Sequence, residues 1–286
     1  MKLRTFLFLF AASAFSSGAP TQTGATGYDE HLDAVRKRMP EDFNLVEEPP
    51  FIIVSDQDDR NLNLSVQTVR WTVQRLKKDF FAKNPDETID IWLFKTKTSY
   101  YKNTRTVFQE DPISPFGYYS PKHRALIMNI ATGGGTLVHE MVHPFMRTNF
   151  PTCPTWFDEG LASLFEQCTD RKGHIAGEIN WRLPGLQEAI RTGKTIPFQQ
   201  LSALSPAEFY GADDNSEYNK YYGQARYLCY YLQEQGLLVK FYREFTANAS
   251  TDPTGYATLQ RVLGVDDMAA FQKKWEAFVL ALPVPK

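Results

Sequence analysis

Thr136-Leu137-Val138-His139-Glu140-Met141-Val142-His143 has the residue spacing of a helix and carries two histidines four positions apart. Residues at that spacing lie on one face of a helix, so His139 and His143 can direct two imidazoles at one metal ion, with Glu140 beside them. Zinc suits this arrangement because it accepts nitrogen and carboxylate ligands, and a hydrolytic zinc centre keeps one position for water. The segment therefore predicts a helix that holds one Zn²⁺ ion.

A third protein ligand is expected in the next predicted helix, which contains Trp156-Phe157-Asp158-Glu159-Gly160. Glu159 is the best candidate because it supplies a carboxylate soon after the first helix. Its neighbour Asp158 points about 100° away on a helix, whereas Ser163 lies one turn further on the same face. Either side chain is a candidate hydrogen-bond partner of a metal-bound histidine, and Asp158 could equally cap the helix or face solvent.

Pro144 directly follows the second histidine of the predicted metal site. Proline lacks the amide that would bond the Glu140 carbonyl, and it disfavours helical geometry at His143. We therefore expect the helix to kink or end close to this residue.

The two segments together resemble the gluzincin metallopeptidases, in particular the peptidase-MA-like group of bacterial proteins. The resemblance is carried by residues 135–143 and 154–163, and a looser similarity extends over residues 51–282. It implies a zincin-like fold in which His139, His143 and Glu159 bind zinc and Glu140 is the general base. The chain differs from the better-known gluzincins in a slightly shorter separation between His143 and Glu159.

The ligand set predicts that the protein hydrolyses peptide bonds. Two neutral imidazoles and one carboxylate leave a zinc site with net positive charge, which lowers the pKa of a bound water. Glu140 can accept the proton of that water and pass it to the leaving amine. A developing oxyanion needs a further donor, and the resemblance implies Tyr222 of Tyr222-Gly223-Gln224-Ala225. The chain has 14 tyrosines, and simple packing is the alternative role of this one.

Composition and the first residues bear on partners and location. The chain has 286 residues and a formal net charge of -2, which gives no long-range attraction to nucleic acid or to an anionic membrane. Lys2 and Arg4 precede a short apolar stretch and then small residues, as in a secretory signal peptide. We expect residues 1–19 to be removed, leaving a secreted or periplasmic protein without stable membrane insertion, whose partner is a peptide or protein substrate.

Export makes the three cysteines informative. An oxidising compartment permits Cys153 and Cys168 to pair, and such a bridge would staple the segment that carries Glu159. We favour this pairing slightly, with Cys229 left as a buried thiol. Three reduced cysteines are the open alternative, because sequence does not fix the distance between the two sulfurs.

Hydrophobic patterns predict an α+β fold. Strands are expected at residues 51–54, 89–94, 118–119 and 124–130, and helices at residues 64–81 and 99–107. After residue 170 the pattern is mostly helical, with helices expected at residues 186–190, 205–210, 222–238 and 266–282. We therefore predict an N-terminal mixed lobe over residues 20–148, a C-terminal helical lobe over residues 149–286, and an active-site cleft between them.

Two other functions fit the sequence. A His-x-x-x-His pair with a glutamate arises by chance in about one chain per hundred or more of this length, so the motif alone is not decisive. One alternative is a catalytically silent zincin-like protein that binds a peptide or acts in the cell envelope, although the intact Glu140 argues against it. The other is a structural protein in which the motif is accidental, which zinc analysis would test directly.

Overall fold

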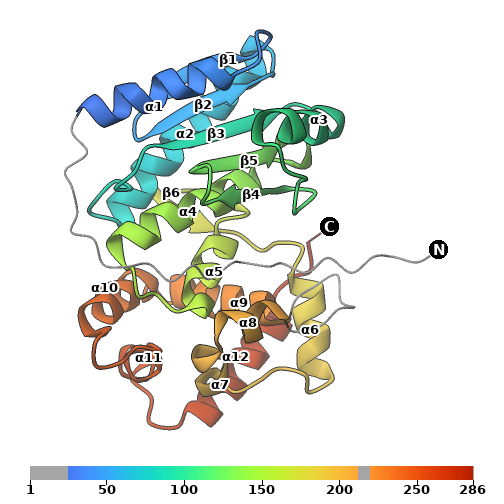
Figure 1. Cartoon of the computed structure of the whole chain (residues 1–286). Coiled ribbons are helices and arrows are strands. Elements are labelled where there is room, and N and C mark those ends of the chain that lie inside the picture. Colours follow the sequence, from blue (N-terminus) through green and yellow to red (C-terminus); the bar gives the residue numbers. More distant parts are fainter. Residues whose placement is uncertain (1–24, 212–219, 286) are drawn as a thin grey trace. The chain divides into compact units, whose positions relative to one another are not determined.

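The computed structural model describes residues 25–211 and 220–285, and it belongs to the mixed α+β class expected from the sequence (Figure 1). The predicted signal peptide lies outside the described residues. Internal contacts divide the chain into two units, of which the first comprises residues 1–70 and 85–137 and the second residues 71–84 and 138–286. No helix among the described residues has the length and apolar character needed to cross a membrane.

The first unit is built on a five-stranded sheet in the order β1-β2-β3-β5-β4. The strands are β1 (Asn44–Glu48), β2 (Phe51–Ser55), β3 (Ile89–Phe94), β4 (Gly117–Ser120) and β5 (Ala125–Asn129). The three central strands run parallel, and each edge strand is antiparallel to its neighbour. Central strands buried on both faces read as continuous apolar runs rather than as alternating patterns, and this is why β2, β3 and β5 were predictable.

Helices cover the sheet of the first unit. Helix α1 (Ala25–Arg38) and helix α3 (Lys97–Phe108) share one apolar core with the sheet, which includes Val35, Trp92 and Tyr100. The Thr96 hydroxyl accepts a hydrogen bond from the Ser99 amide and so caps the start of α3. Helix α2 (Asp59–Asp79) and the 3₁₀ turn Ile130–Thr132 complete the order of elements before residue 135. The strands and the helices α2 and α3 confirm the sequence predictions, whereas α1 and β1 were not predicted because their apolar residues are few and scattered.

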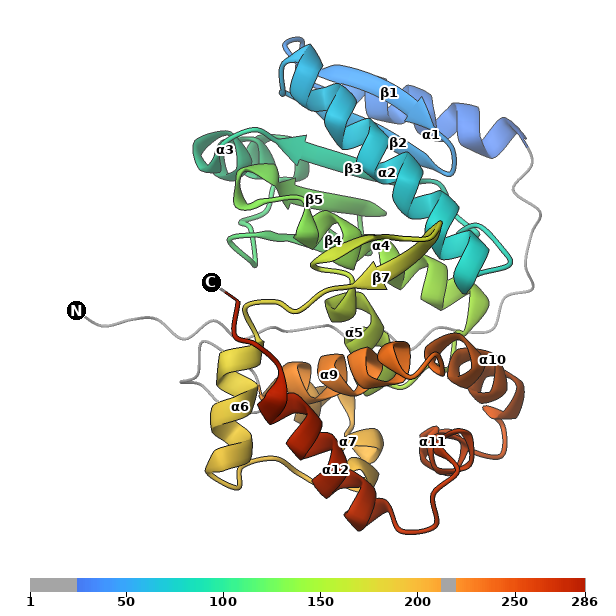
Figure 2. The same cartoon turned by 180° about the vertical axis from the view of Figure 1, so that it is seen from behind.

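The second unit is mainly helical. Its elements are α4 (Gly135–Asn149, from Val138 on), α5 (Thr155–Leu164), β6 (Cys168–Arg171), β7 (His174–Gly177), α6 (Leu183–Arg191), α7 (Phe198–Ala203), α8 (Pro206–Gly211), α9 (Lys220–Glu234), α10 (Leu238–Asn248), α11 (Tyr256–Leu263) and α12 (Met268–Ala281). Helices α6 and α12 pack against α9 and against each other (Figure 2). The predicted helices near α6, α8, α9 and α12 are confirmed, while α7, α10, α11 and the β6–β7 hairpin were missed.

Helix α5 packs closely on α9, and one glycine permits that approach. A side chain at Gly160 would meet the Ala225 carbonyl oxygen at 3.1 Å and the Cys229 sulfur at 3.1 Å. Trp156 and Phe157 are buried on the same helix, and Trp156 donates from its indole nitrogen to the Thr254 carbonyl at 2.9 Å. These contacts fix the helix that presents Glu159.

We expected a lobe boundary near residue 148, whereas the contacts group residues 71–84 and the motif helix from Val138 on with the later helices. Aromatic packing accounts for this grouping. Phe81 stacks on Phe145 of α4 with ring centroids 5.6 Å apart, and it meets Tyr242 of α10 edge-on at 5.6 Å. The segment that follows α2 therefore shares a core with the helices of the second unit.

Two local expectations are corrected. Of the two outcomes expected at Pro144, the end of the helix is wrong: α4 continues to Asn149, because the residues after the proline, Phe145 and Met146, are buried and their packing offsets the one lost hydrogen bond. The favoured disulfide is also absent, since Cys153, Cys168 and Cys229 are all free thiols. Cys168 instead pairs with Gly177 through the backbone of the β6–β7 hairpin.

Candidate metal centre

Helix α4 presents His139 and His143 on one face, as the four-residue spacing predicts. Their rings meet at an interplanar angle of 73° with centroids 5.0 Å apart. Leu137, Met141 and Val142 are fully buried between and beside them, so the helix is anchored by its apolar residues. The two imidazoles are therefore carried on a rigid element.

Glu159 of α5 completes a cluster with the two histidines. One ligand atom from each of His139, His143 and Glu159 lies within 4.8 Å of the others. The Glu159 side chain is buried, and its Oε2 atom lies 3.4 Å from His139 Nε2. The structure thus brings together all three residues that the sequence predicted as metal ligands.

The donor atoms fit a small divalent cation. Glu159 Oε2 is buried yet has no hydrogen-bond partner among the described residues, although a buried carboxylate oxygen normally has one. Two ligands bound to zinc at about 2.0–2.1 Å with tetrahedral geometry lie about 3.3 Å apart. The distance of 3.4 Å between Glu159 Oε2 and His139 Nε2 matches that edge. A cation between the atoms would give the carboxylate the partner that it lacks.

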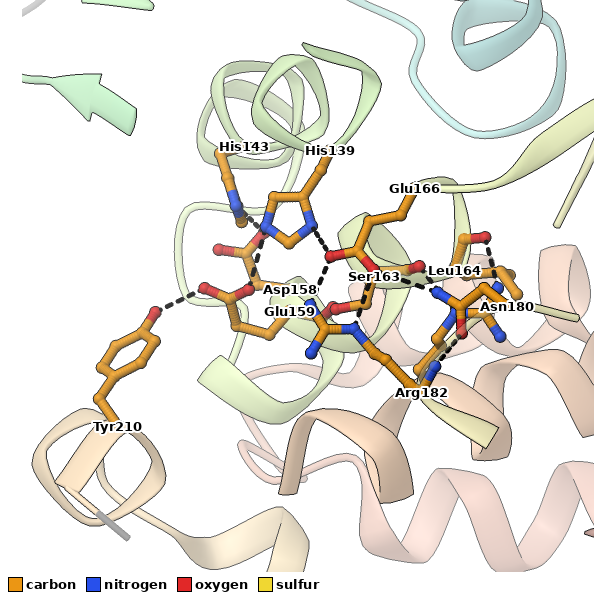
Figure 3. A network of polar contacts seen from close by, with 11 residues as sticks. His139, His143, Asp158, Glu159, Ser163, Leu164, Glu166, Asn180, Arg182 and Tyr210 are labelled. Atoms are coloured by element: carbon orange, nitrogen blue, oxygen red, sulfur yellow. Dashed lines mark hydrogen bonds and ion pairs between the residues drawn. The ribbon is translucent and has the colours of Figure 1, made fainter. Parts of the chain in front are cut away.

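Each ligand also contacts an outer polar side chain (Figure 3). His143 Nδ1 lies 3.0 Å from Asp158 Oδ1, which realises one of the two roles considered for Asp158. His139 Nδ1 lies 3.2 Å from Glu166 Oε1, in an ion-pair contact without full hydrogen-bond alignment. Tyr210 of α8 donates its hydroxyl to Glu159 Oε1 at 2.7 Å. The outer partners of the two histidines lie at their Nδ1 atoms, so both Nε2 atoms are left for a metal. Outer partners of metal-binding histidines commonly take this position.

Ser163 does not contact a histidine. Its hydroxyl donates to the carbonyl oxygen of Glu159, one turn back along α5, at 2.5 Å. The side chain that was a candidate for orienting a metal ligand therefore takes part in the backbone of the helix instead.

Charge and burial in the cluster favour a bound cation. Burial alone would raise the pKa of Glu159, but His143 and His139 outweigh it and lower that pKa to about 2. Burial disfavours the charged form of His143 too, which alone would lower its pKa. Asp158 and Glu159 outweigh burial and raise that pKa to about 9. The Glu159 carboxylate thus stays ionised and requires positive charge beside it, which either protons on the imidazoles or a metal ion in their place can supply.

Glu140 lies between the two ligand histidines in sequence and is partly buried. Burial raises the pKa of its carboxyl, while His139 and His143 act in the opposite direction. Its carboxylate forms no hydrogen bond with another residue in the described part of the chain, so the group is available to accept a proton. This is the position that a general base needs, beside the ligands but not engaged by them.

Tyr222 of α9 lies within electrostatic reach of the cluster. Burial and then the nearby Glu159 raise the pKa of its phenol well above the ordinary value. Its ring centroid lies 6.3 Å from that of Tyr210, and the Arg182 guanidinium lies 5.0 Å from the Tyr222 ring. The predicted role of Tyr222 as an oxyanion donor stays a prediction.

Three residues of the site were not found from sequence, namely Tyr210, Glu166 and Arg182. Tyr210 is one of 14 tyrosines and carries no motif. Glu166 lies beyond the end of α5, where helical spacing no longer predicts direction. Arg182 reaches Glu166 only because the β6–β7 hairpin turns the chain back. Placing Arg182 beside Glu166 from sequence would have required predicting that hairpin.

No protein-family model matches the chain, and no curated protein matches it either. Function is therefore inferred from the chemistry of the metal centre.

Proposed function

We propose that this protein is an exported zinc-dependent peptidase with a zincin-like fold of the gluzincin type. The observation that carries the proposal is the convergence of His139, His143 and Glu159 on one point, with Glu140 beside them. Two imidazoles and one carboxylate are a ligand set of hydrolytic zinc sites, which keep a further position open for water or substrate.

When bound, zinc supplies a positive charge that acidifies a coordinated water and polarises a carbonyl group. The protein's part is to hold and move a proton. Glu140 accepts the proton of the attacking water on its carboxylate and delivers it to the leaving nitrogen of the cleaved peptide. Its raised pKa, caused first by burial, makes it a stronger base than an exposed glutamate. The Tyr222 hydroxyl is the proposed donor to the developing oxyanion.

The state of Glu140 also favours catalysis over a purely structural metal site. A structural site needs ligands and their outer partners, and here Asp158, Glu166 and Tyr210 fill that outer role. Glu140 belongs to neither group, although desolvating its carboxylate is unfavourable. Such a residue is explained by proton transfer and has no function in metal binding alone.

Substitution of Glu140 by glutamine tests the proposal. We expect Glu140→Gln to retain stoichiometric zinc by elemental analysis and to lose hydrolysis of a broad fluorogenic peptide library by about 10²–10⁴-fold. Glu188→Gln is the matched control, because Glu188 is exposed on α6 and forms only a loose pair with Arg191 at 4.0 Å.

Each outcome of this experiment separates the candidate functions. Wild-type protein purified without chelators that contains no stoichiometric zinc would sink the metal proposal. Wild-type protein that binds zinc and cleaves no peptide supports the silent peptide-binding alternative. A fully active Glu140→Gln variant would show that the base is another group.

Export is proposed from the first residues alone, which are basic, then apolar, then small. N-terminal sequencing of protein recovered outside the cytoplasm should find a new terminus close to residue 20. Recovery of the intact Met1 terminus from the cytoplasmic fraction would contradict this part of the proposal.

A further inference from the structure

The Glu166 carboxylate is held by several donors at once, although it lies outside the ligand set. Arg182 donates to it twice, from Nε to Oε2 at 2.8 Å and from Nη2 to Oε1 at 2.6 Å. Asn180 adds a bond from Nδ2 to Oε2 at 3.2 Å. Two parallel bonds from a guanidinium fix both the position and the plane of a carboxylate. Glu166 therefore has little freedom to rotate.

The same carboxylate faces the first metal-binding histidine. Glu166 Oε1, the atom bound by Arg182 Nη2, lies 3.2 Å from His139 Nδ1. The opposite ring nitrogen of His139, Nε2, faces Glu159 Oε2 at 3.4 Å. One ring nitrogen thus faces the ligand cluster, and the other lies in an ion-pair contact with the clamped carboxylate, without full hydrogen-bond alignment (Figure 3).

The guanidinium of Arg182 is itself held in place. It lies 4.1 Å from the ring of Trp181 and 5.0 Å from the ring of Tyr222, so aromatic faces flank it. Its side chain is only 13% exposed. The backbone amide of Arg182 also donates to the Asn180 side-chain oxygen at 3.0 Å, which joins the two residues that bind Glu166.

We infer that Arg182 and Glu166 are positioning residues of the metal centre: Arg182 clamps Glu166, and Glu166 holds the Nδ1 proton of His139 so that Nε2 is offered to the metal. This inference rests on the proposed function in that it requires a metal at His139. A histidine can bind zinc through Nε2 only when that atom carries no proton, and an acceptor at Nδ1 selects that form.

The alternative is that the pair merely closes the β6–β7 hairpin. Glu166 and Arg182 lie on either side of that hairpin, and buried Arg226 also ties the segment together through the Ser163 and Glu178 carbonyls. A pair that only closes the hairpin would affect stability but not the metal. The experiment must therefore measure the metal and the His139 ring, not activity or melting alone.

Zinc affinity and the His139 ring proton provide the test. Zinc dissociation constants of the purified full chain are measured by chelator competition for the wild type, Glu166→Gln, Arg182→Met, Arg182→Lys and the Glu166→Gln/Arg182→Met double variant. We expect each of the first two variants to bind zinc about 10–100-fold more weakly, as is typical when an outer partner of a ligand is lost. Arg182→Lys keeps the charge but not the paired geometry, so its loss should be smaller.

The double variant shows whether Arg182 acts through Glu166. If it does, the double variant loses no more affinity than the weaker-binding single variant, whereas independent effects would multiply. Arg171→Met is the matched control, because Arg171 donates to Glu234 at 2.7 Å in the same unit but lies 43% exposed and away from the cluster. Its zinc affinity should equal that of the wild type.

The proton on His139 Nδ1 gives a readout independent of zinc. In proton NMR spectra recorded with and without zinc, we expect a downfield, exchange-protected ring resonance that is kept in Arg171→Met and lost in Glu166→Gln and Arg182→Met. Wild-type protein that binds no zinc but shows this resonance would overturn the proposed function and keep the contact. Zinc affinities within twofold of the wild type together with an unchanged resonance in folded Glu166→Gln and Arg182→Lys would overturn the inference.

Discussion

Two histidines with carboxylate neighbours, one in each unit, have opposite environments. His31 in the first unit has both ring nitrogens occupied, with Nε2 2.7 Å from Asp90 Oδ1 and Nδ1 2.8 Å from an Arg124 guanidinium nitrogen. His139 in the second unit has one nitrogen turned toward a carboxylate oxygen that lacks a hydrogen bond. The first arrangement is closed, and the second leaves ligand atoms for a cation.

The difference is set by what surrounds each carboxylate. Asp90 is fully buried and is contacted by His31, by Arg38 and by the Trp92 indole nitrogen at 3.4 Å. Because an arginine can only donate, Nδ1 of His31 must accept, and its proton sits on Nε2. Burial, then Arg124 and Arg38, lower the pKa of His31 to about 4, whereas carboxylates outweigh burial and raise the pKa of His143 to about 9. In the His31 cluster, arginines supply the positive charge that the Asp90 carboxylate needs. In the His139 cluster, carboxylates surround the histidines, so a cation is still needed.

The largest effect that we expect comes from replacing His139 with alanine, with His31→Ala as the comparison. His139→Ala removes a ligand, so stoichiometric zinc should be lost, a larger effect than the 10–100-fold loss expected for an outer partner. His31→Ala should leave zinc content unchanged and lower the temperature of unfolding. Equal zinc contents in the two variants would remove the distinction between the clusters.

A second prediction concerns Asp90, the buried carboxylate beside His31. Asp90→Asn leaves the half-buried guanidinium of Arg38 without its buried counterion, so the free energy of unfolding should fall by about 3–5 kcal/mol. The control is Asp111→Asn, which breaks an exposed pair with Arg105 and should change stability by less than about 1 kcal/mol. Urea unfolding measures both, and similar losses would show that burial of Asp90 matters less than its geometry indicates.

The pKa of His31 predicts a third effect, the dependence of stability on pH. Its folded pKa, about 4, lies below the value of about 6.5 for an unfolded histidine, so between these values the unfolded chain binds more protons. Stability from this group is thus complete above pH 6.5 and declines by about 2–3 kcal/mol as the pH falls toward 4. Subtracting the pH profile of His31→Gln from that of the wild type isolates this contribution, and a difference that stays constant from pH 7 to 4 would contradict it.

How far the sequence predicts each cluster follows from the same contrast. His139, His143 and Glu159 lie on two successive helices, and four-residue spacing together with one short loop was enough to bring them together. His31 and Asp90 are 59 residues apart, on a helix that the pattern did not predict and on the central strand β3. No local periodicity specifies a pairing across a sheet, so this cluster was invisible in the sequence.

The outer contacts of the candidate metal centre show the same limit on a smaller scale. Asp158 was a candidate because it adjoins Glu159, whereas Glu166 lies past the end of α5, where helical spacing gives no direction, and Tyr210 lies 51 residues from its partner. Whether α4 would continue past Pro144 was also left open, since local rules give the cost of the proline but not the burial of Phe145 and Met146 that offsets it. Local spacing predicted the three candidate ligands and offered Asp158 as an outer partner, whereas tertiary packing decided the contacts of Glu166 and Tyr210.

The smallest effect that we expect separates the two tyrosines near the cluster of His139, His143 and Glu159. Tyr210 donates to Glu159 Oε1 at 2.7 Å, so Tyr210→Phe removes one bond to a charged ligand and should weaken zinc binding about tenfold. Tyr222→Phe should leave zinc affinity unchanged, because its hydroxyl is proposed to meet only the oxyanion, and should lower kcat instead. Chelator competition and peptide hydrolysis on both variants decide the assignment. The opposite pattern, with Tyr210→Phe affecting only kcat, would make Tyr210 the oxyanion donor and leave Tyr222 a packing residue.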